Sequence, residues 1–216
     1  MDGGCGHREC YADQQEKLAT LPNAITAVRT VGSLVLVALA FTRNSQLLLA
    51  AAIAVYWIGD IADGWVARRT NSETRTGAVL DILCDRLGCA TCYLAFALFH
   101  PDMWPAIVVF LLQFMVIDNY LSLAFQRWPL SSPNYFYLID PLIWRLNWSP
   151  PAKMTNSAAL LFAMVLTDDA TVPTLLALAV GVVKIWSVLR VVQLPRHASA
   201  SCAKAESLGH LIPSAD

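Results

Sequence analysis

Residues 60–85 read DIADGWVARRTNSETRTGAVLDILCD and place four carboxylates beside long apolar runs. Asp60 and Asp63 are three residues apart, whereas Asp81 and Asp85 are four apart. Residues at either spacing share one face of a helix. Because the polar segment between the two pairs is short, the helices that carry them must be antiparallel neighbours. We therefore expect both acidic faces to converge on one pocket.

The composition of the chain is that of a membrane protein. Of its 216 residues, 56% are hydrophobic and only 14% are charged, whereas a soluble domain carries about 25% charged residues. The mean hydropathy is +0.51. A helix needs roughly 20 apolar residues to cross a bilayer. The sequence thus predicts an all-α integral membrane protein with six transmembrane helices, at residues 21–42, 47–65, 78–99, 103–125, a short 155–168, and 172–192.

The distribution of Lys and Arg predicts the topology. Counted together, Lys and Arg are frequent in the two terminal segments and in the connections 66–77 and 127–153, whereas the opposite side carries only Arg43. Cytoplasmic connections are enriched in Lys and Arg. The first residues also lack the apolar centre of a secretory signal. We expect a multi-pass plasma membrane protein with both termini and the aspartate cluster on the cytoplasmic side.

The polar segments divide the chain into a core domain and two tails. We expect a cytoplasmic tail at 1–19, a six-span domain at 20–194 and a disordered Ser- and Ala-rich tail at 195–216. The aromatic connection 127–153 suits the headgroup layer, where Trp and Tyr rings anchor. A further group, Cys5, His7 and Cys10, is a weak basis for a metal site because its cysteine pair has no matching second pair.

The aspartate cluster calls for a counter-charge. Ionisable residues within a membrane segment are costly and mark functional sites, and four unpaired carboxylates would repel one another and take up protons. One or two divalent cations would remove this repulsion, and oxygen ligands favour Mg²⁺, Mn²⁺ or Ca²⁺ over zinc. Arg29 and Arg68 would suit a diphosphate, while Gly64 and Ala67 are small enough for a ligand to approach the backbone.

Two other interpretations of the cluster stay open. The aspartates could form Asp–Arg pairs that merely hold helices together, for instance Asp85 with its neighbour Arg86. Alternatively, the protein could be a transporter that uses the carboxylates to bind a cation or relay protons. The Arg-rich connection beside the cluster fits the transporter poorly.

The same residues resemble the signature of the CDP-alcohol phosphatidyltransferase family, D-x2-D-G-x2-A-R-x8-G-x3-D-x3-D. The fixed positions of that signature fall on Asp60, Asp63, Gly64, Ala67, Arg68, Gly77, Asp81 and Asp85. The stretch PNAITAVR also resembles the family's first-helix element P-N-x-x-T-x-x-R, with Asn23, Thr26 and Arg29 in its fixed positions. The resemblance covers roughly residues 20–190 and is sharp at these two places.

The resemblance implies an enzyme that replaces the CMP of CDP-diacylglycerol with an alcohol, using Mg²⁺ or Mn²⁺ on a six-helix fold. It implies that Asp60, Asp63 and Asp81 hold metal, and that Asp85 completes the metal site and acts as the general base. It also implies contacts to the CDP moiety from Asn23, Thr26, Arg29, Gly64, Ala67, Arg68, Thr74 and Gly77. A different interpretation also stays open, in which the chain is a catalytically inactive relative that serves as a membrane scaffold.

The acceptor alcohol is less well specified. Glycerol 3-phosphate is the leading expectation, with inositol phosphate, inositol or serine as alternatives. A phosphorylated acceptor needs cations, and those on the expected side are Arg127, Arg145, Lys153 and Arg190. Lys153 and Thr155 resemble part of the G-K-x-K-T stretch of phosphatidylglycerophosphate synthases, although Ala152 replaces its Gly and its second Lys is missing. We expect no nucleic-acid partner, and a homodimer stays open.

For other polar residues near the spans we expect structural rather than catalytic roles. Asp118 and Asn119 could line the acceptor cavity or could pair with Lys184, and we favour pairing. Asp140 is expected to be a solvated loop residue. The cysteines within the third span are expected to pack as small hydrophobes.

Overall fold

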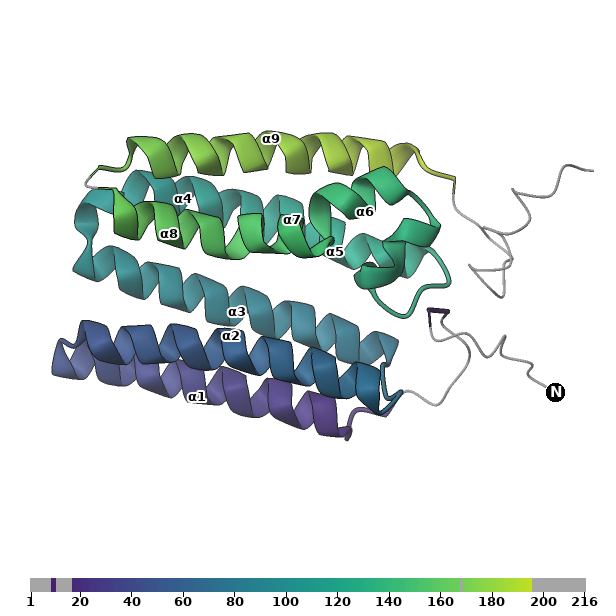
Figure 1. The fold of residues 1–216 in the computed structure, drawn as a ribbon, viewed down its shortest axis with the longest axis horizontal. Coiled ribbons are helices and arrows are strands. Elements are labelled where there is room, and N and C mark those ends of the chain that lie inside the picture. Colours follow the sequence, from purple (N-terminus) through teal and green to yellow (C-terminus); the bar gives the residue numbers. More distant parts are fainter. Residues whose placement is uncertain (1–8, 11–16, 168, 196–216) are drawn as a thin grey trace, which may run out of the picture.

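The structure is a computed structural model that describes residues 9–10, 17–167 and 169–195. Within these residues the chain folds into a bundle of long helices (Figure 1). Cys5, His7 and the tail 196–216 lie outside the described residues. The helices are α1 (Leu21–Arg43), α2 (Gln46–Arg69), α3 (Arg75–Phe99), α4 (Trp104–Leu112), α5 (Asn119–Leu123), α6 (Pro141–Asn147), α7 (Pro150–Met154), α8 (Leu160–Leu166) and α9 (Thr171–Gln193).

Shorter helical turns connect or interrupt these helices. Three are 3₁₀ turns, namely η1 (Pro101–Met103), η3 (Ala124–Arg127) and η4 (Pro133–Leu138). Two are π-helical: η2 (Gln113–Asp118) lies between α4 and α5, and η5 (Thr155–Ala159) lies between α7 and α8. The helical path therefore continues from α4 to η3 and from α7 to α8.

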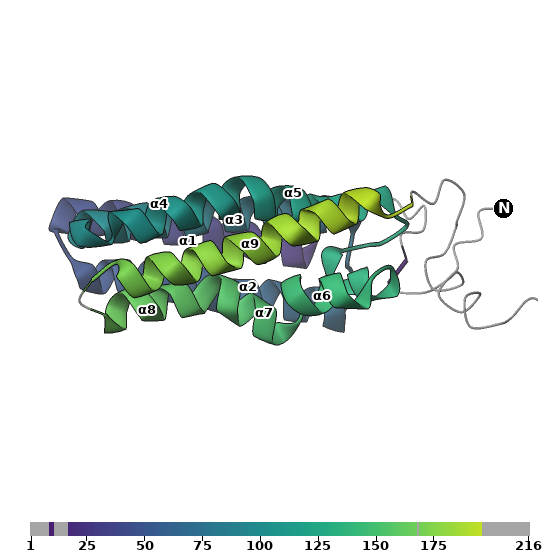
Figure 2. The ribbon, with the colours of Figure 1, turned by 90° about the horizontal axis from the view of Figure 1, so that it is seen from above.

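Helix α3 lies in the middle of the bundle. The first two helices pack against each other and against α3 on one side, while α4 and α5 contact α3 on the other (Figure 1). Helix α9 runs between α4 and the α6–α8 segment and contacts both (Figure 2). Residues of α3 can therefore face both the N-terminal hairpin, which is formed by α1 and α2, and the helices that follow α3.

Five helical segments are long and apolar enough to cross a membrane: Leu21–Arg43, Gln46–Arg69, Arg75–Phe99, Pro101–Arg127 and Thr171–Gln193. Large apolar side chains such as Val31, Ile58 and Leu178 are exposed on their outer faces, as lipid contact requires. These segments confirm five of the six expected spans in length and composition. The expected sixth span falls on the shorter path from α7 through η5 to α8, and it stays a prediction.

Local capping explains the antiparallel pairing of α2 and α3. Helix α2 ends at Arg69 with Thr70 as its C-cap, after which Asn71 adopts a left-handed conformation with φ 50°. Helix α3 then begins after Thr74, whose side chain accepts a hydrogen bond from the Gly77 amide at 2.9 Å. The reversal is short, as the sequence predicts. At the start of α1, Thr20 is the N-cap and Pro22 lies in the first turn.

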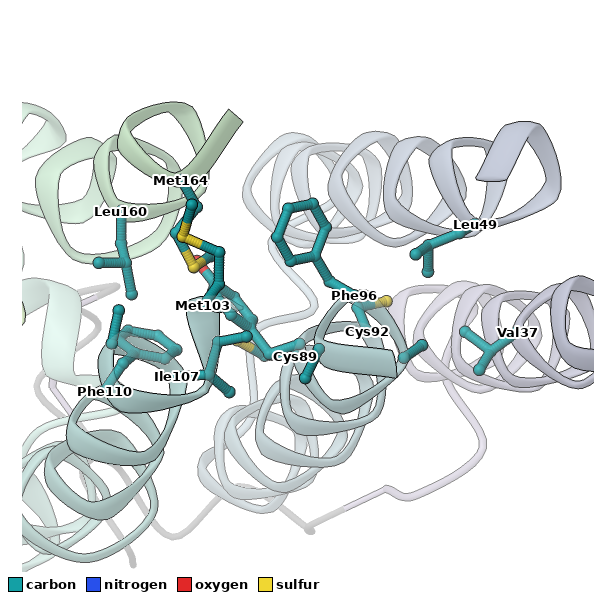
Figure 3. Packing of buried hydrophobic residues seen from close by; sticks show 14 of the residues in the cluster. Val37, Leu49, Cys89, Cys92, Phe96, Met103, Ile107, Phe110, Leu160 and Met164 are labelled. Atoms are coloured by element: carbon teal, nitrogen blue, oxygen red, sulfur yellow. The ribbon is translucent and has the colours of Figure 1, made fainter. Parts of the chain in front are cut away.

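The main core lies between the hairpin and the C-terminal helices. It includes Cys89, Cys92 and Phe96 from α3, which pack with apolar side chains from α1, α2, α4 and α8 (Figure 3). Cys89 and Cys92 are buried free thiols, and Cys84 is half-buried. The expectation that these cysteines pack as small hydrophobes is confirmed for Cys89 and Cys92.

The aromatic connection 127–153 forms a second core. Trp128, Phe136 and Trp148 are buried and in contact, with ring centroids 5.2 Å apart for Trp128 and Phe136 and 4.9 Å for Phe136 and Trp148. These three rings pack within the protein, whereas the expected position of the connection in the headgroup layer stays a prediction. Their apolar surface is removed from water by packing together as η4 and α6 fold back onto the bundle.

Candidate active site

The four aspartates of the opening stretch converge at one end of the α2–α3 pair. One carboxylate oxygen from each of Asp60, Asp63 and Asp81 lies within 4.8 Å of the others. Asp85 joins them through a shared contact with the Arg29 side chain of α1. The structure thus brings the two acidic faces together, as the spacing predicts.

Arg29 lies at the centre of the cluster. Its Nε donates to Asp63 Oδ2 at 2.8 Å, and its Nη2 donates to Asp81 at 2.5 Å and to Asp85 at 2.8 Å. The same Nη2 is 3.5 Å from an oxygen of Asp60. One cation therefore faces four carboxylates, and the cluster keeps an excess of negative charge.

Helix α1 approaches α2 closely at this point because of Gly59. A Cβ atom added at Gly59 would lie 2.4 Å from the Cβ of Arg29, closer than real side chains come. The ring of Tyr56, one turn earlier in α2, lies 5.5 Å from the Arg29 guanidinium. Gly59 and Tyr56 are not among the site residues predicted from the sequence, although the position of Gly59 directly before Asp60 is a usable signal.

Exposure differs among the cluster side chains. Those of Arg29 and Asp63 are 2% and 4% exposed, whereas those of Asp60, Asp81 and Asp85 are 43%, 39% and 26% exposed. Asp63 also accepts a hydrogen bond from Thr26 Oγ1 at 2.7 Å. Arg29 and Asp63 are thus the buried part of the cluster. The cluster borders two pockets: Asp63 and Asp81 line the first, and Asp60, Asp81 and Asp85 line the second.

The first pocket is an open cavity of about 460 Å³ between the starts of α1 and α3 and the end of α2. Seven of the eight residues expected to contact CDP line it: Asn23, Thr26, Gly64, Ala67, Arg68, Thr74 and Gly77. Arg29, the eighth, is not among its lining residues. Arg29 was expected from the sequence to suit a diphosphate, but its side chain is buried and contacts the carboxylates of the cluster instead.

The second pocket, of about 910 Å³, is lined by Asp60, Asp81 and Asp85 and by residues from α3 to η5. It shares Ala78, Asp81 and Asn134 with the first pocket. The aspartate cluster therefore stands between two cavities, and Asp81 contacts both.

The four cations expected near the acceptor occupy different places. Lys153 lines the second pocket, where its Nζ donates to Asn134 Oδ1 at 2.7 Å. Arg127, Arg145 and Arg190 are not among the lining residues of either pocket. Arg127 instead donates to the carbonyl of Val191 at 3.1 Å. The structure thus brings one of the four to the site.

Arg190 is held by Asp140, and this contact corrects the interpretation of Asp140 as a solvated loop residue. Asp140 is buried, and its Oδ1 accepts from the amides of Leu142 and Ile143 at 2.9 and 3.0 Å. Its Oδ2 accepts from Arg190 Nε at 2.7 Å. The expectation was wrong because Asp140 is the N-cap of α6, where unpaired amides bind a carboxylate.

A second buried charge network borders the second pocket. Arg86 donates to Asp118 at 2.6 Å and to Ser122 at 2.9 Å, and Lys184 contacts the other oxygen of Asp118 at 2.6 Å. The alternative in which Arg86 pairs with its neighbour Asp85 is not what the structure shows. The expected pairing of Asp118 with Lys184 is confirmed, and Asp118 lines the cavity as well.

The carboxylate cluster fits a divalent metal ion. Its donors are all oxygens, three of them lie within 4.8 Å of one another, and two belong to side chains more than a third exposed. Hard cations such as Mg²⁺ and Mn²⁺ prefer such ligands. Asp60, Asp63 and Asp81 are therefore the group that could hold a metal here.

The family is established by comparison with known proteins. The sequence model of the CDP-alcohol phosphatidyltransferase family matches residues 19–188, and the chain belongs to this family of phospholipid-synthesis enzymes. Two similar proteins are a "Putative cardiolipin synthase" of Mycobacterium bovis, 30% identical over 52% of this chain and 54% of its own length, and a "Phosphatidylinositol phosphate synthase" of Mycolicibacterium smegmatis, 34% identical over 45% and 46%. The chain spans about half the length of the curated relatives it matches. No solved structure matches.

Proposed function

We propose that the protein transfers a phosphatidyl group from CDP-diacylglycerol to a small phosphorylated polyol and releases CMP. The observation that carries this proposal is the position of Asp81 in the wall shared by two pockets, with Asp85 opening onto the second. We assign the first pocket to the CDP moiety and the second to the acceptor. Glycerol 3-phosphate is the leading acceptor, and inositol phosphate is the next.

The donor pocket suits a nucleoside diphosphate. Arg68 supplies a guanidinium that can contact phosphate oxygens in bidentate fashion. Gly64 and Gly77 leave space at the wall, and a Cβ added at Gly77 would lie 2.7 Å from Thr74 Oγ1 and 2.9 Å from Asn23 Oδ1. Small residues therefore keep the pocket open beside the polar side chains that would orient the ligand.

The metal would be held by Asp60, Asp63 and Asp81, with Asp85 close by. A divalent cation at this place supplies positive charge to the diphosphate and to the departing CMP. Arg29 keeps the Asp63, Asp81 and Asp85 carboxylates oriented through its three hydrogen bonds.

Asp85 is the proposed general base. The acceptor hydroxyl oxygen bonds to the phosphatidyl phosphorus as its proton moves to Asp85, and the bond from that phosphorus to the CMP oxygen breaks. CMP leaves with the electron pair of that bond. Because donor and acceptor sit in adjoining pockets, no covalent enzyme intermediate is needed.

The phosphate of the acceptor is assigned to Lys153. Its Nζ lies in the second pocket beside Asn134, where a phosphate could accept from it. The name of the Mycolicibacterium relative supports a phosphorylated inositol as one such acceptor. Because the second Lys of the G-K-x-K-T stretch is missing, this pocket has fewer cations than a glycerol 3-phosphate acceptor would suggest.

We also propose that the protein crosses the plasma membrane six times, with α7–α8 as the sixth span and both termini in the cytoplasm. The Lys and Arg distribution supports this orientation. The pockets would then open to the cytoplasmic supply of nucleotide and polyol, while the diacyl chains of the donor stay in lipid.

The proposal is tested by CMP release from the full chain in lipid nanodiscs. With CDP-diacylglycerol and an acceptor present, we expect CMP only when Mg²⁺ or Mn²⁺ is added, and we expect EDTA to abolish it, because the excess negative charge of the cluster repels a diphosphate. The acceptor panel contains glycerol 3-phosphate, inositol 1-phosphate, inositol and serine. If no acceptor yields CMP with either metal, the protein is a transporter or scaffold instead.

The donor pocket gives a second prediction. Arg68→Gln should raise the KM for CDP-diacylglycerol by about 10-fold or more, because a charge-assisted contact to phosphate is lost, while the KM for the acceptor stays unchanged. The matched control is Arg69→Gln, since Arg69 is exposed, lies over the Trp65 ring and does not line the pocket. Equal donor KM values for both variants would contradict the assignment of this pocket.

A further inference from the structure

Residues 132–134 border both pockets. Ser132 and Asn134 line the donor pocket, whereas Pro133 and Asn134 line the acceptor pocket. Every other lining residue of the donor pocket lies between Pro22 and Asp81, in α1, α2, α3 or the α2–α3 connection. The donor pocket is therefore complete only while the 132–134 segment is held against the first three helices.

Contacts with α6 and α7 fix the 132–134 segment on the acceptor side. The Asn134 carbonyl accepts from Trp144 Nε1 at 2.8 Å, and Asn134 Oδ1 accepts from Lys153 Nζ at 2.7 Å. Ser132 Oγ accepts from the Asn134 amide at 3.2 Å and caps the turn η4. These contacts set the shape of the segment, but they do not connect it to the first three helices.

A hydrogen bond from the next residue, Tyr135, connects the segment to the α2–α3 connection. Tyr135 Oη donates to Glu73 Oε2 at 2.7 Å, across 62 positions of the sequence. Glu73 directly precedes the N-cap of α3 and lines the donor pocket itself. Hydrogen bonds to a carboxylate are stronger than those between neutral groups. The contact therefore joins two parts of the pocket lining that are distant in sequence.

Arg75 pairs the same two connections at a point outside the pockets. Its Nη2 donates to the carbonyls of Gln126 at 2.5 Å and Trp128 at 3.0 Å, shortly before the 132–134 segment. Arg75 is the first residue of α3 and lines neither pocket. Because these contacts do not involve Tyr135, removing the Tyr135 hydroxyl should loosen the pocket wall rather than unfold the protein.

The same hydrogen bond bears on the charge of the donor pocket. A carboxylate in the lining opposes the binding of a diphosphate, because like charges brought together repel. A hydroxyl donor at 2.7 Å offsets part of the negative charge of Glu73. Tyr135 thus supports donor binding in two ways, by holding the 132–134 segment and by weakening this repulsion.

We infer that Tyr135 and Glu73 are positioning residues for the donor, whose hydrogen bond holds the 132–134 segment in place as part of the pocket for the CDP moiety. The inference rests on the proposed function, through the assignment of the first pocket to CDP-diacylglycerol. Tyr135 lines neither pocket and acts on the donor through Glu73 and the segment.

The test measures the binding of CDP-diacylglycerol to the full chain in lipid nanodiscs, with Mg²⁺ and without an acceptor. Tyr135→Phe keeps the ring and removes the hydroxyl. It should raise the Kd by about 5-fold, because a charge-assisted hydrogen bond between half-buried side chains is lost. In the turnover assay the donor KM should rise by the same factor while kcat at saturating donor stays near the wild-type value, a split that a general loss of folding would not give.

A double-mutant cycle tests whether Tyr135 acts through Glu73. In a Glu73→Ala background, Tyr135→Phe should change the Kd by less than about 2-fold, because the partner of the hydroxyl is already gone. The matched control is Tyr120→Phe, since Tyr120 is exposed in α5 and lines neither pocket. This control should bind the donor with the wild-type Kd.

The outcomes separate this inference from the proposed function. A wild-type Kd for Tyr135→Phe overturns the inference, and so does an effect of the same size in the Glu73→Ala background. If the wild type does not bind CDP-diacylglycerol, the donor pocket is wrongly assigned and the inference fails with it. If binding responds as expected but no acceptor yields CMP, the inference stands and the proposed transfer reaction is wrong.

Discussion

Asp85→Asn should lower the rate of CMP release by about 100- to 10,000-fold, because a positioned general base contributes a factor of that size. The amide keeps the shape of the carboxylate but cannot take the proton of the acceptor hydroxyl. Arg29 keeps its contacts with Asp63 and Asp81, so the variant should remain folded. The measurement is the initial rate of CMP release at saturating donor and acceptor, with thermal unfolding as the check on folding.

Asp102→Asn is the matched control for this prediction. Asp102 is exposed in η1, which follows the end of α3 away from the cluster. The control should keep the wild-type rate. If Asp85→Asn retains more than a tenth of the wild-type rate, the base is another group.

Arg29→Gln should destabilise the metal-free protein strongly. Removing one partner of a buried ion pair costs about 3–5 kcal/mol, because the other charge is left uncompensated, and here Asp63 is as buried as Arg29. For a chain of this size we expect the unfolding temperature in EDTA to fall by about 10 °C. Mg²⁺ should recover more of the loss in the variant than it adds to wild type, since the ion supplies positive charge to the same carboxylates.

Arg43→Gln controls for the loss of a positive charge from α1. Arg43 is exposed in the last turn of α1, at the other end of the helix from the site. The Arg43→Gln variant should unfold at the same temperature as wild type, both in EDTA and with Mg²⁺. If the Arg29→Gln variant unfolds in EDTA at the same temperature as wild type, the cluster needs no internal cation.

The aspartate cluster could be predicted from sequence because it depends on local rules. Helical spacing places Asp60 with Asp63 and Asp81 with Asp85, and a short capped reversal makes α2 and α3 neighbours. The position of Arg29 could not be predicted in the same way. Whether a cation faces carboxylates or a ligand depends on how closely α1 approaches Gly59, and helical periodicity carries no information on that distance.

The acceptor side was harder to predict because it depends on contacts between distant segments. Arg127 and Arg190 are equal candidates with Lys153 on charge alone, yet the Val191 carbonyl accepts a hydrogen bond from Arg127, and Asp140 accepts one from Arg190. The π-helical turns that place Asp118 and Asn156 have no period of their own in the sequence. Five spans could be predicted because each is a long apolar helix, whereas the interrupted α7–α8 path is too short to be recognised by apolar length.

The two pockets are lined by different parts of the sequence. Apart from Ser132 and Asn134, the donor pocket is lined by residues from Pro22 to Asp81, whereas the acceptor pocket reaches from Tyr56 to Asn156 and takes most of its polar lining from beyond Asp85. Substitutions in the later part of the chain can therefore alter which alcohol is accepted while the groups that handle the nucleotide stay intact. A gene encoding such a chain could acquire a new product by changes confined to its second half.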